Sequence, residues 1–399
     1  MALTVKFCDI ELKNPLIAGS CDYSRNSAYF SKIAASGVSA IVLKSVTDID
    51  SLQNPYITKI NCLDTCGKSW RKGDHFGALY SRGGAMLSIN GWLKEIDRIL
   101  EASEKYSVVP IGSVCASGIQ AWVECSEIMV SKGMRILELN LGNPHFLAAD
   151  SLKEVQEKSF INAMEQIIRS VAAAVSVPVI VKLSPQSGNL VDIVQAAEQC
   201  GVAGVTLSHR FQGLIIDLKT REPLSSSLFG YGGPWMAPIT VGHVFSVSKS
   251  SNVPICASGG ISRVEDVLQV ILAGASTIQM TTAILIEGTG IVKKILVGLE
   301  RYLEDTGIGD VRQLIGFAQR KTGLYDCVES ADIPVVSDTS QCLRCPDKPC
   351  VNSCFFKAIL MGENGIPEIG DNCIGCELCL HMCPFPGVLS ITGRRYFNF

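Results

Sequence analysis

Cysteines near the C-terminus have the spacing of iron–sulfur ligands. The run Cys373-x2-Cys376-x2-Cys379-x3-Cys383 is followed directly by Pro384. In this pattern three thiolates bind one [4Fe–4S] cluster, and the fourth binds a second cluster. The tight loop lets three sulfurs converge, and the proline fixes the direction in which the chain leaves. The sequence therefore predicts two clusters in this region.

A second group of cysteines can complete the two clusters, although it is two residues longer than the first. We expect each group to supply three thiolates to one cluster and one thiolate to the other. The expected ligand sets are Cys342, Cys345, Cys350 and Cys383 for one cluster, and Cys373, Cys376, Cys379 and Cys354 for the other. Zinc is the alternative, because Cys-x2-Cys pairs also bind zinc. Three closely spaced thiolates, then a fourth followed by proline, favour iron–sulfur.

The segment that carries these cysteines, residues 339–399, contains five acidic and five basic side chains. A free ferredoxin is usually strongly acidic, so this neutral segment suits a ferredoxin module packed on its own chain. We therefore predict a small α+β ferredoxin domain at 339–399, joined by a connector at 306–338. One helix is expected in the connector, around Val311–Lys321.

Composition excludes several classes of protein. The chain has 399 residues, 17 cysteines and a net charge of −3, which is too balanced for nucleic-acid binding by bulk positive charge. A secreted disulfide scaffold would be far shorter. No apolar run approaches the ~20 residues of a membrane helix, and the first residues lack the features of a signal peptide. We therefore expect a cytoplasmic protein that binds neither membranes nor nucleic acid.

Residues 1–305 alternate apolar, strand-like runs with amphipathic stretches of helical length. Fully apolar strands indicate parallel strands covered by helices. Eight repeats predict a closed (β/α)8 TIM barrel, with a doubly wound open sheet as the alternative. Leu3–Leu12 reads as a hairpin at the barrel's lower end. The expected strands are Pro15–Ala18, Ala40–Lys44, Val109–Ser113, Ile136–Asn140, Val177–Leu183, Gly204–Ser208, Val253–Ala257 and Thr277–Met280.

Polar residues at the C-terminal ends of the strands are the candidates for chemistry. Lys44 and Lys182 end apolar strands, and an interior lysine without a partner is costly. A bound anion or flavin is the expected partner, and a protein carboxylate is the alternative. Gly259-Gly260 follows strand seven and Thr281-Thr282 follows strand eight. Glycine backbone and helix N-termini there predict a phosphate cradle.

Several stretches resemble the flavin domain of the dihydroorotate dehydrogenase and dihydropyrimidine dehydrogenase families, from Leu3 to about Leu303. They are Asn14–Gly19, Val42–Ser45, Glu138–Leu141, Val181–Pro185, Tyr231–Gly233, Ala257–Ile261 and Gln279–Ala283. Together with the two-cluster module, they are similar to the catalytic half of dihydropyrimidine dehydrogenase. The resemblance implies FMN, with Lys182 stabilising negative charge near N1 of the reduced ring. The implied FMN contacts are Ala18, Gly19, Lys44, Ser45, Asn140, Lys182 and Ser208, with Gly233, Gly259, Gly260, Thr281 and Thr282 around the phosphate.

The sequence departs from the family where substrate binds. Asn143 stands where the family has its catalytic cysteine or serine, and amides do not exchange protons in water's pH range. Ser208-His209-Arg210 replaces the Thr-Asn-Thr of the pyrimidine enzymes. Asn90 is the candidate match to another substrate asparagine.

Two interpretations of these departures stay open. In the first, the proton donor is His209, His145 or Cys115, and Arg210 pairs with an anionic group of the substrate. The alternatives are purely structural roles: packing against the flavin for His145, a buried thiol for Cys115 and a loop salt bridge for Arg210. In the second, the chain is a non-catalytic electron-transfer or assembly subunit.

The long insert Ile49–Arg82 carries Trp70, His75 and Tyr80. Loops of this length are usually lids or interfaces, so we expect its aromatics to wall the substrate or a dimer contact. Cys62-x3-Cys66 alone is a weak metal signal. The remaining thiols, Cys8, Cys21, Cys125, Cys200, Cys256 and Cys327, are expected in the core or on the surface.

We therefore expect an oxygen-sensitive oxidoreductase that acts on a C=C or CH–CH bond. The small-molecule substrate is a dihydropyrimidine-like ring or another anionic conjugated compound. Electrons would pass between the two clusters and FMN one at a time. No GxGxxG fingerprint is apparent, so the electron partner would be a ferredoxin or a separate FAD/NAD(P)H subunit. Family habit suggests a homodimer.

Overall fold

The computed structural model describes residues 2–53, 60–72, 75–81, 86–142, 157–223, 229–320 and 330–396. The chain divides into two compact units, Met1–Thr322 and Gly323–Phe399, which we describe separately. Within the described residues, none of the helices is both long and apolar enough to cross a membrane.

The first unit is built on a closed barrel of eight parallel strands. Every barrel strand pairs with its neighbours in chain order, and the last strand pairs with the first, so the predicted TIM barrel is confirmed and the open sheet is wrong. The strands are β3 (Leu16–Ala18), β4 (Ala40–Val42), β7 (Val109–Val114), β8 (Leu137–Asn140), β9 (Val179–Lys182), β10 (Gly204–Leu207), β15 (Ile255–Ser258) and β16 (Thr277–Met280).

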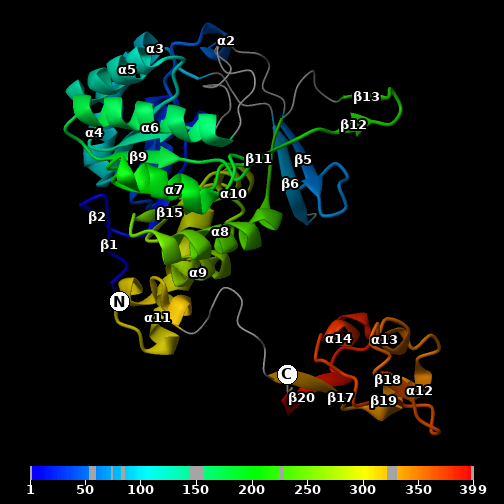
Figure 1. The fold of residues 1–399 in the computed structure, drawn as a ribbon. Helices are drawn as coiled ribbons and strands as arrows, with labels where there is room; N and C mark the ends of the chain where they lie inside the picture. The colour runs from blue at the N-terminus through cyan, green and yellow to red at the C-terminus, as the bar shows by residue number, and fades with distance from the viewer. Residues whose placement is uncertain are drawn as a thin grey trace. The chain divides into compact units, whose positions relative to one another are not determined.

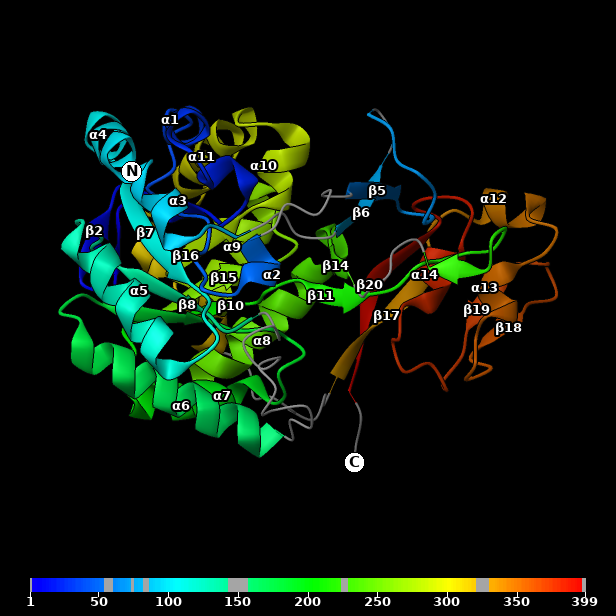
Figure 2. The same cartoon turned by 90° about the horizontal axis from the view of Figure 1, so that it is seen from above.

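Helices surround the barrel in chain order, as the view in Figure 2 shows. Their buried faces and the barrel strands form one hydrophobic core. The helices are α1 (Ser27–Ala34), α2 (Asp50–Gln53), α3 (Ile89–Leu93), α4 (Ile96–Tyr106), α5 (Ile119–Ser131), α6 (Glu157–Ala174), α7 (Leu190–Gln199), α8 (Ala237–Ser250), α9 (Val264–Ala273), α10 (Thr282–Glu287) and α11 (Gly290–Thr306).

The N-terminal hairpin, β1 (Val5–Phe7) and β2 (Ile10–Leu12), lies at the lower end of the barrel. A Cβ atom at Gly204, where β10 begins, would lie 3.1 Å from both the Phe7 ring and the Cys8 Sγ atom. Phe7 is fully buried there, so the hairpin closes the end of the barrel opposite the strand C-termini, as the sequence predicted.

A four-stranded antiparallel sheet stands beside the barrel (Figure 1), and its strand order is β11-β14-β6-β5, with all four strands labelled in Figure 2. Strands β5 (Ile60–Asp64) and β6 (Phe76–Ser81) come from the long insert, while β11 (Phe211–Gly213) and β14 (Phe229–Gly232) follow barrel strand β10. The insert expected as a loop therefore contains strands, because it pairs with a segment that lies about 150 residues later. A short hairpin, β12 (Ile216–Asp217) and β13 (Glu222–Pro223), extends from the same region.

The helix predicted around Val311–Lys321 is wrong. Two 3-10 turns, Val311–Leu314 and Phe317–Arg320, occupy this stretch. Gly316 lies between them at φ +69°, and the left-handed backbone there interrupts a continuous helix.

The second unit is small and mixes short helices with antiparallel strand pairs. Its buried residues include Cys350, Cys379, Ile359 and Leu389, so thiols form part of its core. Its elements are β17 (Ser330–Val336) paired with β20 (Leu389–Tyr396), β18 (Ile359–Met361) paired with β19 (Pro367–Ile369), and helices α12 (Thr339–Arg344), α13 (Pro349–Asn352) and α14 (Leu378–Met382).

Candidate active site

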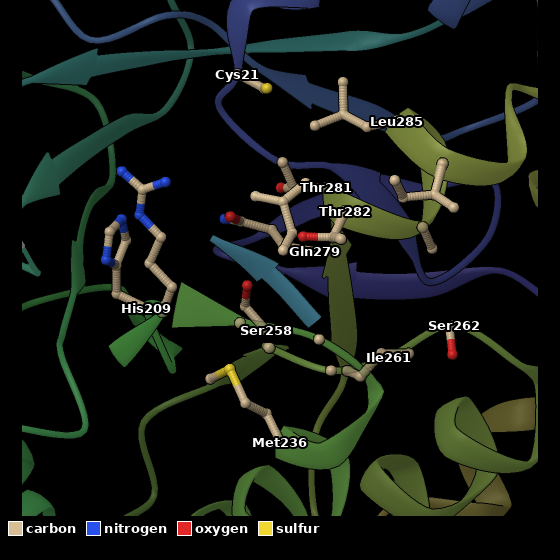
Figure 3. A pocket seen from close by; sticks show the side chains of 18 of the residues that line it. Cys21, His209, Met236, Ser258, Ile261, Ser262, Gln279, Thr281, Thr282 and Leu285 are labelled. Carbon is tan, nitrogen blue, oxygen red and sulfur yellow. The ribbon is translucent and has the colours of Figure 1, made fainter. Parts of the chain in front are cut away.

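A cavity of about 800 Å³ opens at the C-terminal ends of the barrel strands. Figure 3 shows Gln279, Thr281 and Thr282 between His209 at one end and Ser262 at the other. Cationic side chains outnumber anionic ones in its lining. The cations are Lys44, Lys72, Lys182, Arg210 and Arg263, against Asp22, Glu138 and Glu287. A cavity with this lining favours anionic ligands.

Lys44 follows β4 and pairs with Asp22, whose Oδ1 lies 3.1 Å from the lysine Nζ. Lys182, at the end of β9, lies 4.0 Å from Glu138 Oε1. Both lysines expected to need an anion or flavin thus have a protein carboxylate nearby, which was the alternative. Both also line the cavity, so they can still contact a ligand there.

Asn140, at the end of β8, has a buried side-chain oxygen, Oδ1, that receives no hydrogen bond from the described residues. Its Nδ2 donates to Ser45 Oγ at 3.1 Å, and that hydroxyl lies 2.8 Å from Ser113 Oγ. The Asn140 Oδ1 atom accepts no hydrogen bond although it is buried. A buried carbonyl oxygen beside a cavity indicates that a ligand donates a hydrogen bond there.

The end of β15 has the backbone that a phosphate cradle requires. Gly259 and Gly260 have φ angles of +105° and +81°. A Cβ at position 260 would lie 2.3 Å from the Ala237 backbone nitrogen, so only glycine fits. Gly233 is equally constrained, with 2.4 Å between its ideal Cβ and the Gly77 carbonyl oxygen.

The β3 end is packed against β16. Ala18 is fully buried, and Gly19 N donates to Met280 O at 2.9 Å. A Cβ at Gly19 would lie 2.4 Å from Thr281 Oγ1. Ser208, expected at the flavin, lies 3.2 Å from His243 Nδ1 through its Oγ and lines the cavity. Ala18 and Gly19 are outside the cavity lining, whereas the other predicted cofactor residues all line the cavity.

His209 and Arg210 line the cavity next to the end of β10. A Cβ at Gly142 would lie 2.8 Å from His209 Cβ, so the glycine makes room for the histidine. A Cβ at Gly230 would lie 2.0 Å from Arg210 Nε. Two glycines thus accommodate His209 and Arg210, which are among the residues at which the chain departs from the family.

Arg210 is close to a carboxylate and a thiol of the β3 loop. Burial lowers the pKa of Arg210, and the neighbouring Cys21 and Asp22 raise it. Burial raises the pKa of Cys21 while the charge of Lys44 lowers it. Cys21 was expected to be an ordinary core or surface thiol, but it lines the cavity (Figure 3). The sequence could have indicated this position, because Cys21 follows the end of β3 and residues at the C-terminal ends of barrel strands face the active site.

The insert supplies an aromatic wall. Trp70 and Phe76 meet edge to face with their ring centroids 5.6 Å apart, and both line the cavity with His75. The expectation that aromatic residues of this insert wall a substrate site fits this arrangement. No group of three His, Cys, Asp or Glu side chains suited to one metal ion occurs among the described residues, which include Cys62 and Cys66.

Two candidate catalytic residues do not reach the cavity. Cys115 is fully buried outside the lining, and burial with the nearby Asp48 charge raises the pKa of its thiol to about 12. It fits the plain buried thiol rather than the proton donor. Asn90 is exposed on α3 and is also outside the lining. Asn143 and His145 lie outside the described residues, as does Cys327.

Thiols of the second unit gather in two groups. Burial raises the pKa of Cys350, and the neighbouring Cys383, Cys342 and Cys345 raise it further. Burial raises the pKa of Cys379 to about 11, with contributions from Cys373 and Cys376. Cys354 accepts a hydrogen bond from the Ala358 backbone at 3.3 Å. The first group matches one expected ligand set, and the second matches three members of the other.

The barrel, its cationic cavity and its glycine cradle define a class: (β/α)8 barrels that bind a phosphate-bearing ligand at the strand C-termini. The family model described as dihydroorotate dehydrogenase matches residues 84–303. The chain belongs to the dihydroorotate dehydrogenase family, whose members are flavin-dependent oxidoreductases that act on a CH–CH bond and bind FMN.

Curated relatives cover most of the chain. The dihydroorotate dehydrogenase B (NAD(+)) catalytic subunits of Geobacillus kaustophilus and Pyrococcus furiosus are 29% and 25% identical to it. The matches span 81% and 80% of this chain, and 97% and 100% of those proteins. A putative dihydroorotate dehydrogenase A (fumarate) of Aeropyrum pernix is 30% identical over 63% of this chain and 82% of its own length. The names of these relatives give different electron acceptors, NAD(+) and fumarate. The similarity to them therefore indicates the class of reaction but does not identify the electron acceptor.

Proposed function

We propose that this protein is an FMN- and iron–sulfur-dependent oxidoreductase for a small conjugated substrate that carries an anionic group. The observation that carries the proposal is Arg210 in the cationic cavity, beside the residues that fit a flavin. Where the pyrimidine enzymes have Thr-Asn-Thr, His209 takes the place of the asparagine that holds the substrate amide, and Arg210 takes the place of the following threonine and adds a positive charge. Guanidinium groups bind carboxylates through charge-assisted, often bidentate hydrogen bonds.

FMN fits the residues around the cavity. Gly259 and Gly260 leave backbone open for the phosphate, and Thr282 begins α10 beside them. Asn140 presents a buried carbonyl oxygen that lacks a donor, and Lys182 offers an ammonium group. When bound, FMN exchanges a hydride with carbon and single electrons with metal clusters.

Residues of the chain itself bind the substrate, exclude water from it and hold the proton that the substrate carbon exchanges. Arg210 binds the anionic group, while Trp70 and Phe76 cover an apolar part of the substrate and limit entry of water. His209 takes over from the missing cysteine as the group that holds the proton for the substrate carbon, because it lines the cavity and imidazole is the commonest general acid or base in enzymes.

Two [4Fe–4S] clusters fit the thiols of the second unit. Each cluster thiolate binds a different iron atom, so the ligands stand further apart than those of a single ion. This agrees with two thiol groups whose charges interact although the described residues form no single-ion site. A bound cluster transfers one electron at a time. The partner that exchanges those electrons is a ferredoxin or a flavoprotein subunit, and the two-cluster arrangement resembles dihydropyrimidine dehydrogenase.

Cofactor content is tested on anaerobically purified full-length protein. We expect FMN on denaturation and about eight iron atoms per chain. Protein that contains zinc but no iron, or that releases no flavin, contradicts the proposal.

The anion preference is tested with orotate and uracil, which differ by a carboxylate. Arg210→Gln should weaken orotate binding about 10- to 100-fold, as expected for loss of a charged hydrogen bond, and leave uracil binding unchanged. Ligand-induced changes in the flavin spectrum report both. Equal losses for the two ligands would show that Arg210 has a structural role only.

A further inference from the structure

Glu138 is a buried carboxylate in the barrel core. It lies on β8 and is fully inaccessible to solvent. Its Oε2 accepts hydrogen bonds from Thr206 Oγ1 at 2.9 Å and Gln279 Nε2 at 2.5 Å. Its Oε1 has no hydrogen-bond donor among the described residues. A carboxylate in this setting requires a compensating positive charge.

Lys182 is the nearby cation. Its Nζ lies 4.0 Å from Glu138 Oε1, and its side chain is 8% exposed. The same ammonium donates to Gln279 Oε1 at 2.8 Å. Gln279 therefore bridges the pair, with its oxygen on the lysine and its nitrogen on the carboxylate.

This arrangement keeps the ammonium close to the carboxylate without a direct hydrogen bond. Glu138, Lys182 and Gln279 all line the cavity. Lysine has three donors, so contact with Gln279 leaves others for a ligand. The strength of the lysine's field at that ligand depends on Glu138, because charges interact strongly at low dielectric.

We propose that Glu138 is a positioning residue that sets how strongly Lys182 stabilises the negative charge of reduced flavin. The inference rests on the proposed binding of FMN beside Lys182. Glu138 offsets the lysine charge, and Gln279 holds the ammonium away from full contact with it. The midpoint potential of the flavin therefore depends partly on the Glu138 carboxylate, which acts through Lys182.

The test is the midpoint potential of bound FMN, measured by anaerobic spectroscopic titration of the full-length protein. Glu138→Gln keeps the shape and removes the charge, so the potential should become more positive. Glu138→Asp keeps the charge and should restore a potential close to that of the wild type. Thr206→Val is the matched control, because it removes a hydrogen bond to the same carboxylate without changing its charge.

A purely structural role for Glu138 would leave the potential of folded Glu138→Gln protein unchanged, and that result would overturn the inference while leaving FMN binding intact. Wild-type protein without flavin would overturn both. If Glu138→Gln does not fold, Gln279→Met tests the same link. It leaves Glu138 as the acceptor for Lys182, so the potential should become more negative; no change overturns the inference.

Discussion

Arg210 passes so close to Gly230 that a Cβ atom at position 230 would lie 2.0 Å from the arginine Nε. The guanidinium group reaches the cavity over a glycine that belongs to β14, in the sheet beside the barrel. The position of a proposed substrate-binding side chain therefore depends on a residue that is not part of the cavity lining.

Gly230→Ala should displace Arg210 and reproduce the loss of orotate affinity expected for Arg210→Gln, about 10-fold or more. The neighbouring side chain must shift because no Cβ tolerates such a contact. Gly242→Ala is the matched control, since a Cβ there meets nothing within 4 Å. Orotate affinity that is equal in the two alanine variants would contradict the assigned path of Arg210.

His209→Gln should lower the turnover number about 100-fold or more while leaving orotate affinity near the wild-type value. Glutamine keeps hydrogen bonding and removes proton exchange. Gly142→Ala should lower turnover as well, because its Cβ would lie 2.8 Å from His209 Cβ. Steady-state kinetics separate an effect on turnover from an effect on substrate affinity. A fully active His209→Gln enzyme would exclude His209 as the proton donor.

Buried thiols should make the protein less stable at high pH. Burial raises the pKa of Cys115 and Cys256 from the ordinary value of 9.0 to about 12. Both thiols stay protonated when folded but ionise on unfolding, so their stabilisation is complete below pH 9 and is lost between about pH 9 and 12. At pH 10 each should cost about 1.4 kcal/mol relative to pH 8.

Urea unfolding at pH 8 and pH 10 checks this expectation. Cys115→Ala should be less stable than the wild type at pH 8 but lose less stability on going to pH 10. An identical pH dependence in the two proteins would mean that the Cys115 thiol is not shielded from water.

Cys350→Ser and Cys379→Ser should each remove one cluster and reduce iron from about eight to about four atoms per chain. Each residue is buried within a separate thiol group. Cys66→Ser, at an exposed thiol of the first unit, is the control. The measurement is the iron and acid-labile sulfide content per chain. Full iron content in Cys350→Ser or Cys379→Ser protein would contradict the expected ligand sets.

The barrel was predictable because apolar β-branched runs such as Val179–Lys182 are buried on both faces and leave a plain pattern. The sheet formed by β6 and β14 was not, because its strands pair across a large sequence separation. A carboxylate partner for Lys44 was only the alternative in the sequence analysis, because the sequence does not show that the loop after β3 brings Asp22 to the end of β4.

Part of the site is visible only in three dimensions. The resemblance to the family marked His209 and Arg210 as unusual, but it gave no reason for Gly142 and Gly230, whose roles depend on direct contacts with those two side chains in the folded chain. Glu138 belonged to a matching stretch without a stated role, since its partners lie on β9, β10 and β16.

Anaerobic reoxidation of fully reduced protein tests the central claim most directly. The panel pairs unsaturated carboxylates, orotate among them, with uncharged analogues, and flavin absorbance follows the reaction. We predict that at least one anionic compound reoxidises the flavin within seconds and that its uncharged analogue does not. If no member of the panel does so, while an external electron acceptor oxidises both flavin and clusters, the protein is an electron relay and the proposed catalytic role is contradicted.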